Sequence, residues 1–221
     1  MDLFLIGNII AAAGALVGFN YGCLLFFRPR IASYAQMITF AVGCISCGKV
    51  YLVIRMLTIG DVTERFQLGV LGVVGSLLFL FTANYGAMDG LADDRSEKYR
   101  MYRLIPLALS AVILAVYLFF TLFTEQPILN KIVSGIITLL AICASYFNLK
   151  HLIFPDVDYG VIACLKGYNL LAVIYELLCV GETIAVGWNS SVLMLIIGIL
   201  MCMILPAMVI AVDRGMKKWL A

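Results

Sequence analysis

Residues 191–212 read SVLMLIIGILMCMILPAMVIAV, a run of 22 residues without a single charge. A helix needs about 20 apolar residues to cross a hydrocarbon core of roughly 30 Å. Six further stretches meet this requirement, and each is bounded by charged residues or by Pro, Gly and Asn clusters. The seven predicted spans are 3–27, 31–54, 67–88, 104–123, 132–153, 159–186 and 191–212. Because the runs are continuously apolar rather than alternating, they predict helices and not barrel strands.

The composition of the whole chain points the same way. Of its 221 residues, 64% are hydrophobic and 13% are charged, and the mean hydropathy is +1.07. A soluble domain has about 45–50% apolar and about 25% charged residues. A water-soluble fold could not bury this excess, which excludes a soluble enzyme, a nucleic-acid-binding protein and a disordered chain. We therefore predict an all-α membrane protein, a seven-transmembrane-helix bundle that forms one domain over residues 1–221 and has no enzymatic activity.

Lysine and arginine residues near the ends of the spans predict the orientation, because cytoplasmic loops carry the excess of these residues. Three of them fall on one side of the membrane, namely Arg55, Arg65 and Lys131. Ten fall on the other side, namely Arg28, Arg30, Arg95, Lys98, Arg100, Arg103, Lys150, Arg214, Lys217 and Lys218. The N-terminus is accordingly expected outside and the C-terminus in the cytoplasm. We expect a multi-pass protein of the cell membrane.

Three asparagines recur at intervals of 64 residues. Asn20-Tyr21-Gly22 in the first span is matched by Asn84-Tyr85-Gly86 in the third, and Asn148 follows in the fifth. All three asparagines are expected at one depth and facing inward, where amide hydrogen bonds between helices give about 0.6–2 kcal/mol each. The interval suggests a helical-hairpin repeat, for which coincidence is the alternative explanation.

The sixth span carries the polar residues from which we predict a site. Asn169, Glu176 and Thr183 are spaced by seven residues and form one stripe on the helix. An adjacent stripe holds Tyr168, Tyr175 and Glu182. Glu176 lies near the bilayer centre, where an ionisable residue is costly enough to suggest a function.

We therefore predict a ligand-binding or proton-coupling site inside the bundle. Its residues are Glu176, Asn169, Thr183, Tyr168, Tyr175, Asn20, Asn84 and Asn148. The alternative is a purely structural carboxyl group that hydrogen-bonds neighbouring helices.

Other charged or titratable residues receive structural interpretations. Lys49 and Lys166 are expected to extend their ammonium groups toward the membrane surface. Asp89, His151 and Asp213 are expected to anchor cytoplasmic helix ends. With only one histidine in the chain and only one Cys-x-x-Cys pair, Cys44 and Cys47, we expect no metal and no cofactor. Small residues at 11–14 and at Gly69, Gly72 and Gly75 are expected to pack helices closely.

The charged segment 91–103 predicts what the protein binds on the cytoplasmic side. Its basic residues suit an anionic lipid surface, and they are Arg95, Lys98, Arg100 and Arg103. The same segment could dock a cytoplasmic protein, and the sequence also leaves open a homo-oligomer.

The predicted topology resembles that of sugar facilitators, rhodopsins and bacterial sensor domains, but no motif of those classes is present. The last span, for example, has no lysine that could hold retinal. Our first hypothesis is a carrier or facilitator for a small solute. The alternatives are a seven-span sensor or receptor that signals through a separate cytoplasmic partner, and a non-catalytic subunit of a membrane complex.

Overall fold

The computed structural model describes residues 3–29, 31–60, 68–89, 96–155 and 161–220, and every regular element in these ranges is helical. The long helices are α1 (Leu3–Phe26), α2 (Ser33–Ile59), α3 (Gly69–Thr82), α5 (Arg100–Phe123), α6 (Ile128–Ile153), α7 (Val161–Gly187) and α8 (Ser191–Leu220). A π-helical segment, η1 (Ala83–Met88), continues α3, and a short 3₁₀ helix, η2 (Glu97–Tyr99), precedes α5. Within these described ranges, seven helical segments are long and apolar enough to cross a membrane, which confirms the predicted number.

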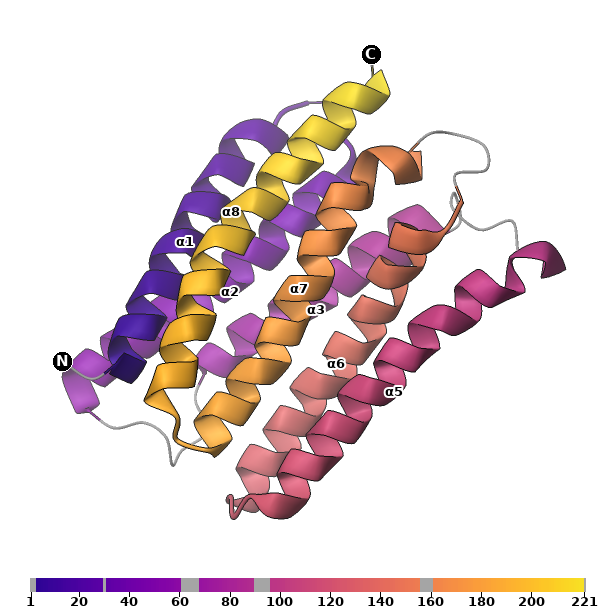
Figure 1. The fold of residues 1–221 in the computed structure, drawn as a ribbon. Coiled ribbons are helices and arrows are strands. Elements are labelled where there is room, and N and C mark those ends of the chain that lie inside the picture. Colours follow the sequence, from indigo (N-terminus) through magenta and orange to yellow (C-terminus); the bar gives the residue numbers. More distant parts are fainter. Residues whose placement is uncertain (1–2, 30, 61–67, 90–95, 156–160, 221) are drawn as a thin grey trace.

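Six helices form a closed ring and the seventh lies outside it (Figure 1). Going round the ring, α1 packs on α2, α2 on α3, α3 on α6, α6 on α7, α7 on α8, and α8 on α1. Helix α5 packs mainly on α6 and buries only Pro106 and Ile113. The two termini lie at opposite ends of the bundle, which we call the N-terminal end and the C-terminal end.

Glycines bring two helix pairs into backbone contact, as the small-residue patterns predicted. A Cβ atom on Gly14 would lie 2.3 Å from the Cα of Cys202, so α1 and α8 touch there. A Cβ on Gly72 would lie 2.5 Å from the carbonyl oxygen of Cys44, where α3 meets α2. Such close approach increases the van der Waals contact that drives helix association in lipid.

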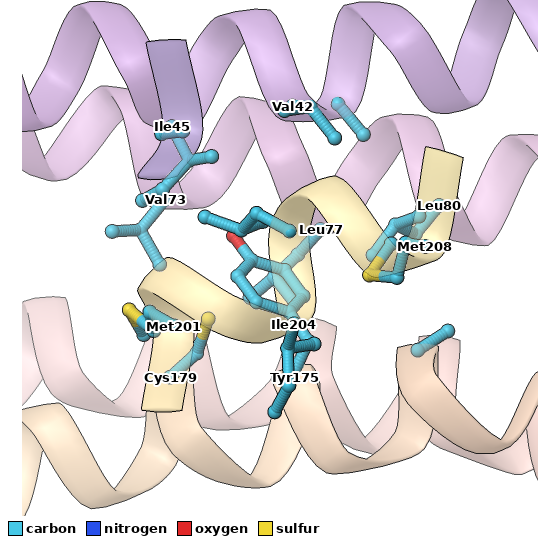
Figure 2. Close-up of a cluster of buried hydrophobic side chains, with 14 of the residues drawn as sticks. Val42, Ile45, Val73, Leu77, Leu80, Tyr175, Cys179, Met201, Ile204 and Met208 are labelled. Atoms are coloured by element: carbon cyan, nitrogen blue, oxygen red, sulfur yellow. The ribbon is translucent and has the colours of Figure 1, made fainter. Parts of the chain in front are cut away.

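Midway along the bundle, apolar side chains fill the interior of the ring around one tyrosine (Figure 2). Tyr175 of α7 lies among Leu77 of α3 and Met201, Ile204 and Met208 of α8. Its hydroxyl group is 2.8 Å from the hydroxyl of Ser76. This apolar layer separates the polar side chains of α7 into two groups, one toward each end of the bundle.

Helices α5 and α6 begin four residues before their predicted spans, and α2 and α8 continue at least five residues past the ends of theirs. Helix α2 continues five residues past 54, to Ile59, and α8 continues eight residues past 212, to Leu220. The extension of α8 is polar, and its Lys217 ammonium lies 2.6 Å from the Asp213 carboxylate one turn earlier. Hydropathy alone places a span end at the last apolar residue, whereas helical hydrogen bonding continues into the charged segment.

Candidate functional site

The first polar group, the Glu176 cluster, lies on the side of Tyr175 toward the C-terminal end of the bundle. Glu176 is completely buried, and its Oε1 accepts a hydrogen bond of 2.6 Å from Nδ2 of Asn148 on α6. Its other carboxyl oxygen, Oε2, is buried and has no hydrogen-bond partner in the part of the chain that the structure describes. Leaving a buried polar atom unsatisfied costs about 1–3 kcal/mol, which makes this group a candidate for function.

The cluster continues from Asn148 to a neighbouring helix. Oδ1 of Asn148 accepts a hydrogen bond of 2.7 Å from Nδ2 of Asn84, the second residue of η1. The same Nδ2 lies 3.1 Å from the hydroxyl of Tyr168, and Oδ1 of Asn84 lies 3.1 Å from Nδ1 of His151. Glu176 and His151 are therefore joined by two amides in series.

At its outer edge the cluster meets Asp89, which follows η1. Oδ1 of Asp89 lies 2.5 Å from the Lys150 ammonium and 3.4 Å from Nε2 of His151. Burial raises the pKa of Asp89, but hydrogen bonds from His151 and Lys150 and their positive charges outweigh it and hold that pKa below its ordinary value. Asp89 is thus a carboxylate at neutral pH.

The π-helical segment explains why Asn84 and Asp89 can contact one histidine. Residues five apart in an α-helix point about 140° away from each other. In a π-helix the backbone bonds join residues five apart, and here the Asp89 amide donates to the Asn84 carbonyl. The wider turn brings the two side chains toward the same face, where α6 supplies His151.

His151 was predicted as an interface anchor, and this is wrong. The side chain is 1% exposed and lies inside the cluster. The prediction used only its position near the end of α6, whereas its surroundings come from η1.

The second polar group, the Lys49 cluster, lies toward the N-terminal end. Lys49 of α2 forms a buried ion pair with Glu182 of α7, and its ammonium also donates a hydrogen bond of 3.1 Å to Oδ1 of Asn8. The second carboxylate oxygen of Glu182, Oε2, has no hydrogen-bond partner among the described residues. The cluster therefore offers one unoccupied acceptor beside a neutralised ion pair.

The expectation that Lys49 reaches the membrane surface is also wrong. Lys49 is 1% exposed. Because α2 continues to Ile59, its Cα lies ten residues, or about 15 Å, from the end of the helix. Glu182, which approaches from α7 across the ring, neutralises the ammonium instead. By contrast, Lys166 is exposed, and Asp213 pairs with Lys217 on the same helix.

A cavity of about 110 Å³ adjoins the Lys49 cluster. Its walls come from all six ring helices and include residues near the N-terminal end, such as Phe4 and Met194. Most of the lining is apolar. Its polar side chains are Asn8, Gln126, Asn130, Ser134, Glu182 and Thr183.

The structure brings five of the predicted site residues into these two regions. Glu176, Asn148, Asn84 and Tyr168 form the Glu176 cluster, and Thr183 lines the cavity.

Tyr175 and Asn169 are buried but belong to neither region. Tyr175 bonds to Ser76 in the apolar layer, and Asn169 has a buried Oδ1 without a hydrogen-bond partner. Their burial agrees with an inward-facing stripe on α7.

Asn20 does not join the other asparagines, so the prediction of three inward amides is wrong for it. Its side chain is exposed and donates a hydrogen bond of 2.8 Å to the Leu16 carbonyl of its own helix. Helix α1 turns Gly14 and Gly18 toward α8 instead. The 64-residue repeat stays a prediction, although Asn84 and Asn148 do bond to each other.

Sequence reasoning did not include Lys49, Glu182, Asn8, His151 and Asp89 in the site. One signal was available, since Lys49 and Glu182 are opposite charges within apolar spans. Pairing them requires knowing that α2 and α7 approach each other, and no local pattern contains that information.

Of the residues proposed to contact anionic lipid, Lys98 lies in η2, and Arg100 and Arg103 lie in the first turn of α5. Arg95 lies outside the described residues. Lys98 and Arg100 are exposed, and Nη2 of Arg103 donates a hydrogen bond of 2.8 Å to the Ser96 carbonyl. Lys98 and Arg100 therefore present their charges outward, and binding of anionic lipid here stays a proposal.

Comparison with known proteins gives no assignment. No protein family, curated protein or solved structure matches the chain.

Proposed function

We propose that this protein is a cell-membrane carrier or facilitator for a small solute, with its binding site in the cavity beside α7. The observation that supports it best is the position of Glu182. This carboxylate is 8% exposed, lines the cavity and keeps one oxygen without a partner. A buried acceptor in an apolar chamber is the arrangement that small-molecule sites use to orient a ligand.

The location of the cavity fits uptake from outside. The cavity lies toward the N-terminal end, which the count of basic residues places outside the cell. Toward the other end, the apolar layer around Tyr175 fills the interior. In a carrier, this closed layer would have to open for release on the opposite side.

The charges at the site favour a neutral solute. Lys49 already neutralises Glu182, so a bound ion would add an uncompensated charge to an apolar chamber, at a cost of several kcal/mol. A hydroxyl or amide group on the solute could donate to the free oxygen of Glu182. An engineered apolar cavity of about 150 Å³ holds benzene, so the present chamber suits a molecule of that size or smaller.

Solute flux into proteoliposomes tests the proposal. Purified protein is reconstituted in vesicles, and swelling is followed by light scattering after mixing with propane-1,2-diol or butyramide. We expect faster swelling than in protein-free vesicles, and no acceleration with propylammonium. The Val133→Phe variant, which fills the cavity, should lose most of the acceleration.

Ile132→Phe is the matched control, because Ile132 lies next to Val133 in α6 but is 52% exposed. It should leave the flux unchanged. If both neutral probes stabilise the protein against heat without entering the vesicles, the sensor hypothesis gains and the carrier proposal fails. Equal loss in both variants would also contradict a site in this cavity.

A further inference from the structure

The Glu176 cluster is separate from the cavity and has an internal direction. Nδ2 of Asn84 donates toward Asn148, and Nδ2 of Asn148 donates toward Glu176. The carbonyl end of the Asn84 side chain therefore faces His151, so Nδ1 of His151 must be the donor in that contact. The hydrogen bonds therefore all point in one direction, from His151 through Asn84 and Asn148 to Glu176.

The second ring nitrogen of His151 also faces an acceptor. Nε2 lies 3.4 Å from Oδ1 of Asp89, the carboxylate oxygen that also pairs with the Lys150 ammonium. A neutral imidazole has one donor and one acceptor nitrogen, whereas the imidazolium ion has two donors. The surroundings of His151 therefore match its protonated form.

We propose that His151 and Glu176 form one proton-binding site, in which Asn84 and Asn148 make the protonation of one residue depend on that of the other. While His151 carries the proton, the amides point as in the structure and Glu176 accepts as a carboxylate. The two amides are held in this direction by their own helices, because Nδ2 of Asn84 also lies 3.3 Å from the Leu80 carbonyl and Nδ2 of Asn148 lies 3.2 Å from the Ala144 carbonyl. Their aligned dipoles favour a positive charge at the His151 end and a negative charge at the Glu176 end. A proton that Glu176 takes up from water therefore favours release of the His151 proton to water.

The other neighbours are compatible with this arrangement. The Tyr168 hydroxyl accepts a hydrogen bond from Nδ2 of Asn84. The titratable groups around Glu176 are Tyr168 and Cys179 on its own helix, and α8 faces the interior with an uncharged segment from 191 to 212. Those around His151 are Asp89 and, on its own helix, Lys150. Among the described contacts, Glu176 is the only titratable group that accepts a hydrogen bond from the Asn148 amide.

The single histidine of the chain makes the proposal directly measurable. The full-length protein, labelled with [¹⁵N]histidine and held in lipid nanodiscs, gives ring-nitrogen NMR signals from His151 alone. We expect both nitrogens to carry protons at neutral pH and one to lose its proton at higher pH. Glu176→Gln, which keeps the shape but removes the carboxylate, should lower the midpoint of this titration by about half a pH unit or more. Glu125→Gln, at an exposed site, is the control and should not shift it.

A double-mutant cycle tests transmission through the amides. Asn148→Leu should lower the midpoint as well, and adding Glu176→Gln to it should produce no further shift. Additive shifts would mean that Glu176 acts through space and would overturn the proposal, as would an unchanged midpoint in Glu176→Gln. If Asn148→Leu does not fold, Glu176→Gln alone decides. The readout needs no solute, so its result is independent of the carrier proposal.

Discussion

At the scale of single residues, the Lys49–Glu182 pair depends on both partners being present. Each charge has lost most of its hydration, and only the other charge, with Asn8, compensates for that loss. Removing one partner of a buried pair costs about 3–5 kcal/mol, whereas replacing both with apolar residues of similar volume is often neutral. The pair therefore stabilises the bundle only when both residues are present.

This asymmetry predicts the outcome of a three-variant comparison. Lys49→Met and Glu182→Met should each lower the free energy of unfolding by about 3–5 kcal/mol, because each leaves an uncompensated buried charge. The double variant should regain most of the loss. Reversible unfolding in mixed detergent micelles provides the measurement.

Lys217→Met serves as the control for loss of a lysine. Lys217 is 72% exposed and pairs with Asp213 at the end of α8, so its loss should cost less than about 1 kcal/mol. A double variant at positions 49 and 182 that is as unstable as either single one would contradict the pairing.

At the scale of helices, the α1–α8 contact predicts a strong effect of one methyl group. In Gly14→Ala the new Cβ would lie 2.3 Å from a backbone atom of α8, so the two helices must separate. Overpacking of this kind costs about 1–3 kcal/mol. The same unfolding assay should show this loss.

Gly167 provides the matched control on another helix. A Cβ atom at Gly167 would meet nothing within 4 Å. Gly167→Ala should therefore be neutral or stabilise α7 by up to about 1 kcal/mol, because alanine favours helix over glycine. Equal destabilisation by both substitutions would show that backbone contact is not the cause.

At the scale of the whole molecule, the orientation in the membrane can be tested with residues exposed at opposite ends of the bundle. Glu125 lies between α5 and α6 at the N-terminal end, and Lys217 lies in α8 at the C-terminal end. If the excess of basic residues is cytoplasmic, a membrane-impermeant maleimide should label Glu125→Cys in intact cells. Lys217→Cys should react only after permeabilisation.

The unmodified chain is the control for that labelling, because its seven cysteines all lie within helices. Labelling of Lys217→Cys in intact cells would show that the protein has the opposite orientation, with the C-terminal end outside. The cavity would then face the cytoplasm, which would change the proposal from uptake to export.

The sequence by itself determined the number of long helices, their approximate limits and the burial of Glu176. These properties follow from local composition, because the free energy of placing a helix in lipid sums over its own residues. The spacing of Asn169 and Glu176 predicted an inward face, because residues seven apart lie on the same side of a helix.

Only the tertiary structure decided which polar groups meet. Lys49 is paired with Glu182, His151 is enclosed by Asn84 and Asp89, and Asn20 is left outside. Lipid is as apolar as leucine, so hydropathy does not select helix neighbours. Helix neighbours are instead selected by close contact between small residues and by hydrogen bonds between helices. The π-helical turn at Asn84 then sets the faces of η1, and the cavity is the space that the packing of the six ring helices leaves unfilled.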